Sequence, residues 1–159
     1  MSSQIYLKLT GSKQGLISAG CSSYNSIGNK YQDNHTDEIF VYSTNYDISR
    51  HQNLSHSPFV MTKPDDKSTP LLLSSISNNE ILDCEFFYYR IDSHGILSLY
   101  KKIKLTKASI VSISNNHPSS LNHNDMQPYE TVCFRYESIT CQHIAANTSG
   151  YSIKEDSIR

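Results

Sequence analysis

Tryptophan is absent from this 159-residue chain, and only 18% of the residues are charged, with a net charge of −1. This small and balanced charge leaves no dense basic patch, which argues against binding to nucleic acid or to an anionic membrane surface. No apolar run approaches the roughly 20 residues of a membrane-spanning helix. The start, MSSQIYLKLTGSKQG, lacks the apolar region of a Sec signal peptide. We therefore expect synthesis in the cytosol and, if the protein leaves the cell, export by another machine.

Motifs for catalysis and cofactor binding are also missing. The sequence contains no G-x-S-x-G, no G-x-x-x-x-G-K-[ST] and no G-x-G-x-x-G. No C-x-x-C spacing links the four cysteines, Cys21, Cys84, Cys133 and Cys141. In a protein made in the cytosol, this spacing favours free buried thiols over disulfides or zinc ligands. The sequence therefore predicts no cofactor and no enzyme.

One cluster could still carry metal or acid–base chemistry: His117, His123, Asp125 and His143, around the stretch LNHNDMQP. The local spacing is H-x5-H in a loop interrupted by prolines, which matches no zinc motif. Asparagine and aspartate side chains commonly satisfy the backbone groups of such loops. We interpret this stretch as a structural loop, with candidate residues His123, Asn124, Asp125 and Gln127. An enzyme that uses these histidines remains a less favoured alternative.

Tyrosine is abundant, with 11 copies, and short alternating segments recur along the chain. IYLKLTG, residues 37–49 and ILDCEFFYYRID are typical of strands, and SHG is typical of a hairpin turn before ILSLYKKIKL. ASIVSIS is predicted as a separate strand. In YETVCFRYESITCQHIA the apolar phase switches, which predicts a bulge near Glu137. Residues 13–30 are predicted as turns and short extended pieces, and residues 50–57 as a loop.

One helix is predicted, over residues 69–79. Ser68 or Thr69 can cap it, Pro70 suits its first turn, and Asn78 and Asn79 end it. A helix this short must pack on a sheet to be stable. The prediction is therefore one mainly β domain over residues 1–159, a compact antiparallel two-sheet β-barrel with one short flanking α-helix and a polar tail at 154–159.

Four stretches together resemble the Hcp (haemolysin-coregulated protein) family: GLISAGCSSYNSIGNKYQ, DKSTPLLLSSISNNEILDCEF, LNHNDMQPYETVCFRYESITCQH and NTSGYSI. The resemblance runs from about Ile5 to Ile153. It implies a tube subunit of type VI secretion that assembles as six-membered rings. The rings would stack into a hollow tube inside a contractile sheath, with a spike at its tip and small effectors in its lumen. The resemblance further implies a protein that is cytoplasmic when assembled and is expelled from the cell.

The chain departs from many of the relatives that it resembles at two positions. Cys141 replaces a tryptophan, and Asn147 replaces a glycine where the backbone is expected to need a positive φ. Some family members carry a toxic C-terminal extension. We expect none here, because the sequence stops eight residues after Tyr151.

The polar excursion over residues 31–57 is the candidate for an arm that lies on a neighbouring subunit. Its candidate contact residues are Tyr31, Gln32, Tyr42, Tyr46, Arg50, His51 and Gln52. An ordinary hairpin on the chain's own barrel is the simpler alternative for this segment. For the whole protein, the alternative is a soluble β-sandwich ligand-binding module, lectin-like, that uses its tyrosines.

Overall fold

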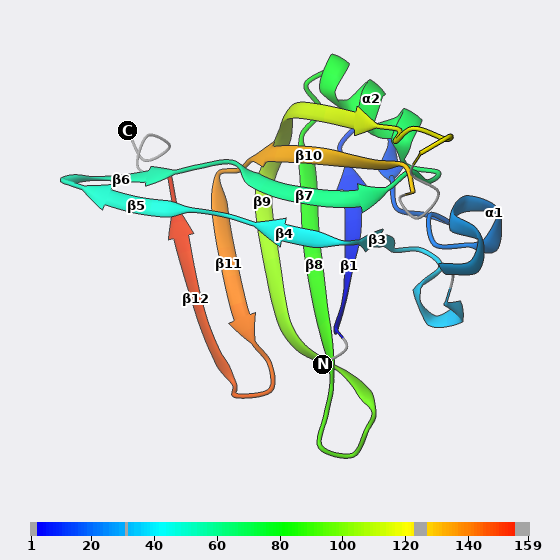
Figure 1. Ribbon diagram of the computed structural model, residues 1–159. Coiled ribbons are helices and arrows are strands. Elements are labelled where there is room, and N and C mark those ends of the chain that lie inside the picture. The colour runs from blue at the N-terminus through cyan, green and yellow to red at the C-terminus, as the bar shows by residue number, and fades with distance from the viewer. Residues whose placement is uncertain (1–2, 31, 123–126, 155–159) are drawn as a thin grey trace.

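The computed structural model describes residues 3–30, 32–122 and 127–154 (Figure 1). Most of these residues lie in antiparallel strands, so the mainly β prediction is confirmed. The strands are β1 (Ser3–Gly11), β2 (Gly15–Leu16), β3 (Ile39–Val41), β4 (Ser43–Asn45), β5 (Ile48–His51), β6 (Asn53–His56), β7 (Phe59–Pro64), β8 (Leu82–Ile91), β9 (Leu97–Asn116), β10 (Tyr129–Arg135), β11 (Ser138–His143) and β12 (Thr148–Ile153). The helices are α1 (Tyr24–Ile27) and α2 (Thr69–Ser77), with 3-10 turns at Gly28–Lys30 and Asp33–His35.

The long strand β9 belongs to two sheets. Its first half pairs with β8 and β11, and its second half, Ser109–Asn116, pairs with β10. The strand bends at Lys107, which has a φ of 50°. The predicted strand ASIVSIS is therefore the second half of β9 and not a strand of its own. Tyr136 and Glu137 separate strand β10 from strand β11, opposite the bend in β9. The sequence predicted a bulge at this position.

The first sheet holds β1, β2, β3, β8, β11 and β12 with the first half of β9, and the second holds β4, β7 and β10 with its second half. The short segment from Ile39 to Asn45 joins their far edges, because β3 pairs with β1 whereas β4 pairs with β7. Strands β3 and β4 are not hydrogen-bonded to each other in the sheet order of the described residues, so the ladder of strands does not close into a full barrel there. The core lies between the two sheets, where fully buried residues include Leu7, Leu9, Ile39, Phe59, Met61, Phe86, Leu105, Val132 and Phe134.

The predicted helix is present as α2, and it ends two residues earlier than predicted, at Ser77. Leu72 is fully buried and Ile76 packs against the core, whereas Leu73 is 64% exposed. The helix therefore binds the barrel through a narrow apolar stripe. The single turn of α1 was not predicted, because residues 24–27 combine polar side chains with only one buried residue, Ile27.

The prediction of a loop over residues 50–57 was wrong. This segment forms a hairpin in which β5 pairs with β6 in a two-stranded sheet of its own. Gln52 occupies the tip with a φ of 76°. The sequence did not predict the hairpin, because its strands are polar and apolar residues do not alternate along them. Together β4, β5, β6 and β7 form one long two-stranded ribbon, which extends past the barrel on one side (Figure 1).

Candidate self-assembly surface

The hairpin of β5 and β6 is largely exposed to solvent. Every residue from Ser49 to Asn53 is exposed, and only Ile48, Leu54 and His56 are half-buried. Figure 1 shows it projecting beyond the barrel, past the end of β12. A two-stranded hairpin is only marginally stable in water by itself. A covering partner would therefore stabilise this segment.

The base of the hairpin is fixed to the barrel by His56. Its Nε2 lies 2.8 Å from the Ser152 hydroxyl of β12, and its ring meets the Tyr136 ring edge-on with centroids 5.6 Å apart. The Ser57 amide also donates a 2.9 Å hydrogen bond to the Asp47 carbonyl. These contacts set the direction in which the hairpin leaves the barrel, while its tip lies outside the core.

The structure brings three of the predicted arm residues together, and it separates the others. Arg50, His51 and Gln52 share the hairpin tip, where Arg50 Nη1 donates to the Gln52 carbonyl at 3.4 Å. Gln32 precedes a 3-10 turn at the other side of the barrel. Tyr31 lies outside the described residues.

Tyr42 and Tyr46 lie on the barrel itself. The Tyr42 amide donates to the Thr62 carbonyl at 2.7 Å, and the Tyr46 ring stacks on Phe59 with centroids 5.8 Å apart. Burial raises the pKa of both phenols above its ordinary value. Both side chains also remain exposed, Tyr42 by 40% and Tyr46 by 37%, so their part in an arm stays a prediction.

The predicted structural loop joins β9 to β10. Gln127 accepts a hydrogen bond from the Lys30 ammonium, which ties the loop to the 3-10 turn Gly28–Lys30. His123, Asn124 and Asp125 lie outside the described residues. Of the other two histidines in this group, His143 pairs with Lys101 near the start of β9, whereas His117 follows Asn116 at its end. These two rings therefore stand at opposite ends of one strand.

Burial restricts the chemistry of two of the four cysteines, Cys21 and Cys84. All four are free thiols, and burial raises the pKa of Cys21 to about 12 and that of Cys84 still further. The protonated thiol is a poor nucleophile and a poor metal ligand. Within residues 3–30, 32–122 and 127–154, no three His, Cys, Asp or Glu side chains are grouped so that they could hold a metal ion. No helix in the same ranges is long and apolar enough to cross a membrane.

A charged cluster that the sequence did not predict lies at the opposite end of the ribbon from the hairpin. The Lys63 side chain is 0% exposed, and its Nζ lies 3.0 Å from Asp66 Oδ1 and 3.3 Å from Glu130 Oε1. Thr69, at the start of α2, donates a 2.8 Å hydrogen bond to Glu130 Oε2. The only sequence signal for this cluster is the presence of Lys63 and Glu130 at buried phases of strands β7 and β10.

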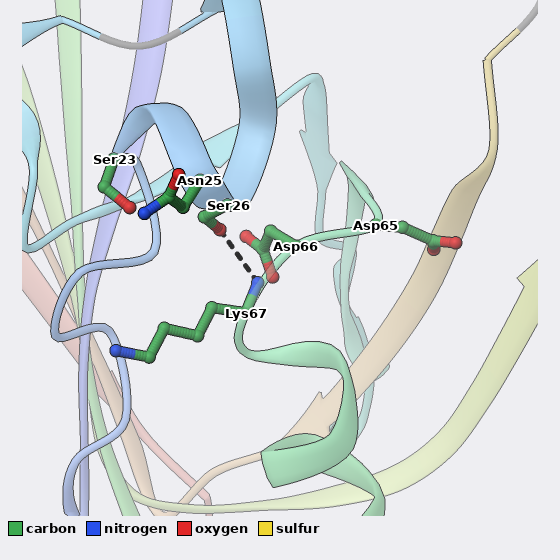
Figure 2. Close-up of a pocket in the computed structure, with 6 residues that line it drawn as sticks. All are labelled: Ser23, Asn25, Ser26, Asp65, Asp66 and Lys67. Atoms are coloured by element: carbon green, nitrogen blue, oxygen red, sulfur yellow. Dashed lines mark hydrogen bonds between the residues drawn. The ribbon is translucent and has the colours of Figure 1, made fainter.

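Beside this cluster is a pocket of about 520 Å³, which we name the polar pocket (Figure 2). Residues of α1 and its approach form one wall, and the connection from β7 to α2 forms the other. The lining residues are Ser23, Asn25, Ser26, Asp65, Asp66 and Lys67. The Lys67 amide donates a 2.8 Å hydrogen bond to the Ser26 hydroxyl, which holds the two walls together.

Comparison with known proteins gives the family. The model of the family described as "Type VI secretion system effector, Hcp" matches residues 6–143, and so the chain belongs to the Hcp family. Over 149 residues the chain is 42% identical to the uncharacterized protein YhhZ of Escherichia coli strain K12, covering 93% of this chain and 37% of YhhZ. It is 34% identical to the major exported protein of Pseudomonas aeruginosa, covering 94% of both proteins.

Solved structures agree with this assignment. The secreted protein Hcp3 of Pseudomonas aeruginosa superimposes with a TM-score of 0.88 at 34% identity, covering 97% of this chain and 99% of Hcp3. A crystal structure of another Hcp protein gives a TM-score of 0.90 at 29% identity, covering 96% and 98%. Hcp proteins are structural tube proteins of type VI secretion and not enzymes. The name of the Pseudomonas aeruginosa relative indicates secretion.

Proposed function

We propose that this chain forms hexameric rings that stack into the hollow inner tube of a type VI secretion system. The observation that carries the proposal is family membership over residues 6–143, combined with 34% identity across 94% of both chains to a major exported protein. The exposed hairpin adds physical support, because it is a surface that a neighbouring subunit would stabilise. Six copies with complementary left and right faces close a ring when their rotations complete a circle.

The hairpin tip is the proposed contact arm of each subunit. Arg50, His51 and Gln52 stand at its end, where they can reach a neighbour without disturbing the barrel. A contact of this kind would order the marginal hairpin. Gln127 and the loop around it are proposed to shape one face of the ring and to take no part in catalysis.

Assembly gives the direct test. Light scattering on the purified chain should give a mass near six times 18.0 kDa, and negative-stain images should show annular particles. A chain that stays monomeric at millimolar concentration would refute ring formation by this protein alone. Deleting the hairpin tip should then convert rings to monomers, and rings that survive the deletion would refute the role of the arm.

The proposed working cycle follows from the tube. The chain would assemble in the cytoplasm inside a contractile sheath, carry a spike protein at the tip of the tube, and leave the cell on sheath contraction without a Sec signal peptide. Small effectors would bind in the lumen with weak, roughly micromolar affinity, so that they dissociate after delivery. Detecting this chain in culture supernatant only when the sheath is functional would support the cycle. Equal export without a sheath would contradict it.

The ligand-binding alternative has one observation in its favour. Tyr42, Tyr88, Tyr89 and Tyr100 line a pocket of about 330 Å³ beside Lys101. Rings that stack on sugars are typical of carbohydrate sites. Saturable binding of a simple sugar by a monomeric chain would favour this alternative, and a hexamer that binds none would exclude it.

A further inference from the structure

A small pocket opens at the seam where the two sheets do not pair. Strand β3 pairs with β1 only as far as Ile5, whereas the chain from Ser43 onward pairs with β7. The start of β1 therefore has β8 on one side and, in the described part of the chain, no strand on the other. The pocket at this seam has a volume of about 330 Å³, and we name it the tyrosine pocket after four of its lining residues, Tyr42, Tyr88, Tyr89 and Tyr100.

The buried Tyr88 forms the bottom of the tyrosine pocket. Tyr88 is 5% exposed, and its hydroxyl lies 2.7 Å from the hydroxyl of Thr44 in β4. This hydrogen bond joins the two sheets across the seam. Burial raises the pKa of the Tyr88 phenol above its ordinary value, so the ring stays neutral at physiological pH. The bottom of the pocket is therefore an uncharged aromatic ring whose hydroxyl already has a partner.

Lys101 is the only charged residue among the described residues that line this pocket. It is half-buried, and its Nζ lies 4.4 Å from the centre of the Tyr88 ring. No described carboxylate forms an ion pair with it. An aromatic face attracts a cation, but it does not replace the acceptors that the three N–H groups of an ammonium can bind. This ammonium therefore favours a ligand with a negatively charged acceptor.

We propose that the tyrosine pocket binds a monosaccharide that carries one carboxylate, a hexuronate, with the carboxylate on the Lys101 ammonium. One ammonium balances one carboxylate, whereas a phosphate monoester carries a charge of about −1.5 to −2. The hydroxyls of Ser3 and Ser43, and the phenols of Tyr89 and Tyr100, line the pocket and can exchange hydrogen bonds with sugar hydroxyls. Tyrosine rings also offer apolar faces to the C–H groups of a sugar ring.

The volume of the pocket limits the ligand to a single sugar ring. Small-molecule sites typically measure about 300–1,000 Å³, and this pocket lies at the lower end of that range. A ligand of this size in an open pocket is expected to bind with a Kd of about 1 mM.

All the groups of this site come from one chain, so the inference goes beyond the proposed ring and does not depend on it. It also differs from the lectin-like alternative, because that alternative is satisfied by a neutral sugar, whereas this site requires a carboxylate.

Saturation-transfer NMR of the ligand, on the purified full chain, tests the site without any mutation. D-glucuronate is the probe, and D-glucose is the matched ligand without the carboxylate. D-glucuronate should bind with a Kd of about 1 mM, and D-glucose should bind at least about tenfold more weakly. Equal binding of the two sugars would overturn the ion pair with Lys101. Absence of D-glucuronate binding at about 20 mM would overturn the site itself.

Variants of two adjacent lysines locate the carboxylate. Lys101→Met keeps most of the apolar stem and removes the charge, so it should weaken D-glucuronate binding by at least about tenfold. Lys101→Arg keeps the charge and should bind within about threefold of the wild type. Lys102→Met is the matched control, because Lys102 Nζ lies 3.1 Å from Glu85 and the residue does not line the pocket. Unchanged binding in Lys101→Met, or an equal loss in Lys102→Met, would overturn the proposal.

Light scattering on the same samples measures assembly separately from binding. A ring that binds no D-glucuronate would overturn this site and leave the ring proposal standing. A monomer that binds D-glucuronate through Lys101 would support this site and contradict the ring proposal.

Discussion

At the pocket end of the ribbon, Lys63 is 0% exposed and lies between two buried carboxylates, whereas at the hairpin end every residue from Ser49 to Asn53 is exposed. The ribbon of β4, β5, β6 and β7 therefore runs from a charged environment without water to one that is surrounded by water. Burial makes each charge at the first end essential to the fold. Exposure places the residues of the second end on the surface, so the two ends should respond differently to mutation.

The largest effect on folding is expected from Lys63→Met. Removing this ammonium leaves Asp66 and Glu130 as two buried carboxylates without their shared cation, which should lower the free energy of unfolding by about 3–5 kcal/mol. Urea denaturation at neutral pH measures the change. Lys102→Met is the matched control. Its Nζ lies 3.1 Å from Glu85, but both side chains are about one-third exposed, so the loss should stay below about 1 kcal/mol. Equal losses in both variants would remove the contrast between the two environments.

A smaller effect is expected from Glu80→Gln, which tests a buried carboxylate held mainly by hydrogen bonds. Burial alone would raise the pKa of Glu80. Hydrogen bonds from the Gln14 side chain and from the amides of Gln14 and Lys13 outweigh burial and lower this pKa. The substitution should reduce the free energy of unfolding at pH 7 by about 1–3 kcal/mol.

The pH dependence of this loss has a definite sign. A lowered folded-state pKa means that the stabilisation by Glu80 is complete above the unfolded-state pKa of about 4.3 and disappears as the pH falls through the folded-state pKa. The difference between wild type and Glu80→Gln should therefore shrink in acid. Denaturation curves between pH 7 and pH 3 measure it, with half-exposed Glu85→Gln as the control. A difference that stays constant or grows in acid would contradict the assigned hydrogen bonds.

At the other end, Gln52→Gly should stabilise the hairpin locally. Gln52 has a φ of 76°, a conformation that glycine adopts without steric cost. We expect a gain of about 0.5–1 kcal/mol, seen as slower hydrogen exchange of the β5 and β6 amides. Asn53→Gly is the control, since Asn53 has no positive φ and the change should speed exchange. Faster exchange in Gln52→Gly would show that the tip is not strained.

The smallest effect on folding is expected when residues 50–54 are replaced by an Asn-Gly turn. This turn fits a two-residue connection between Ser49 and Ser55, which already pair. Because the deleted residues are outside the core, the free energy of unfolding of the monomer should change by less than about 0.5 kcal/mol. Assembly measured by light scattering should nevertheless be lost. A large loss of monomer stability would place the hairpin within the folding unit.

Several local features of this fold could be predicted from the sequence because local chemistry determines them. Pro70 and the asparagines that follow the helix located α2 within two residues. The phase switch near Glu137 located the break between β10 and β11. A positive φ is also present at Asn147, at 59°, where the resemblance to relatives with a glycine implied it. Each of these depends on backbone geometry or alternation over a few residues, which no distant contact overrides.

The candidate surface could be predicted only in part. The sequence selected the polar excursion that contains Arg50, His51 and Gln52, and these three residues do meet at the hairpin tip. It also included Tyr42 and Tyr46, which lie on the barrel away from the hairpin tip and remain partly exposed. The sequence did not predict the hairpin because its strands pair through backbone groups. Their polar side chains show no apolar alternation that would indicate a strand.

By itself, the sequence determined the mainly β class and the position of α2, because propensity and periodicity are local. The resemblance to the Hcp family was carried by four stretches of the sequence. Tertiary structure alone decided that Lys63, Asp66 and Glu130 share one buried cluster, although 67 positions separate Lys63 from Glu130 in the chain. It also decided that β9 bends at Lys107 to serve two sheets. Charge burial and strand partnership depend on which distant segments meet, and that information exists only once the chain has folded.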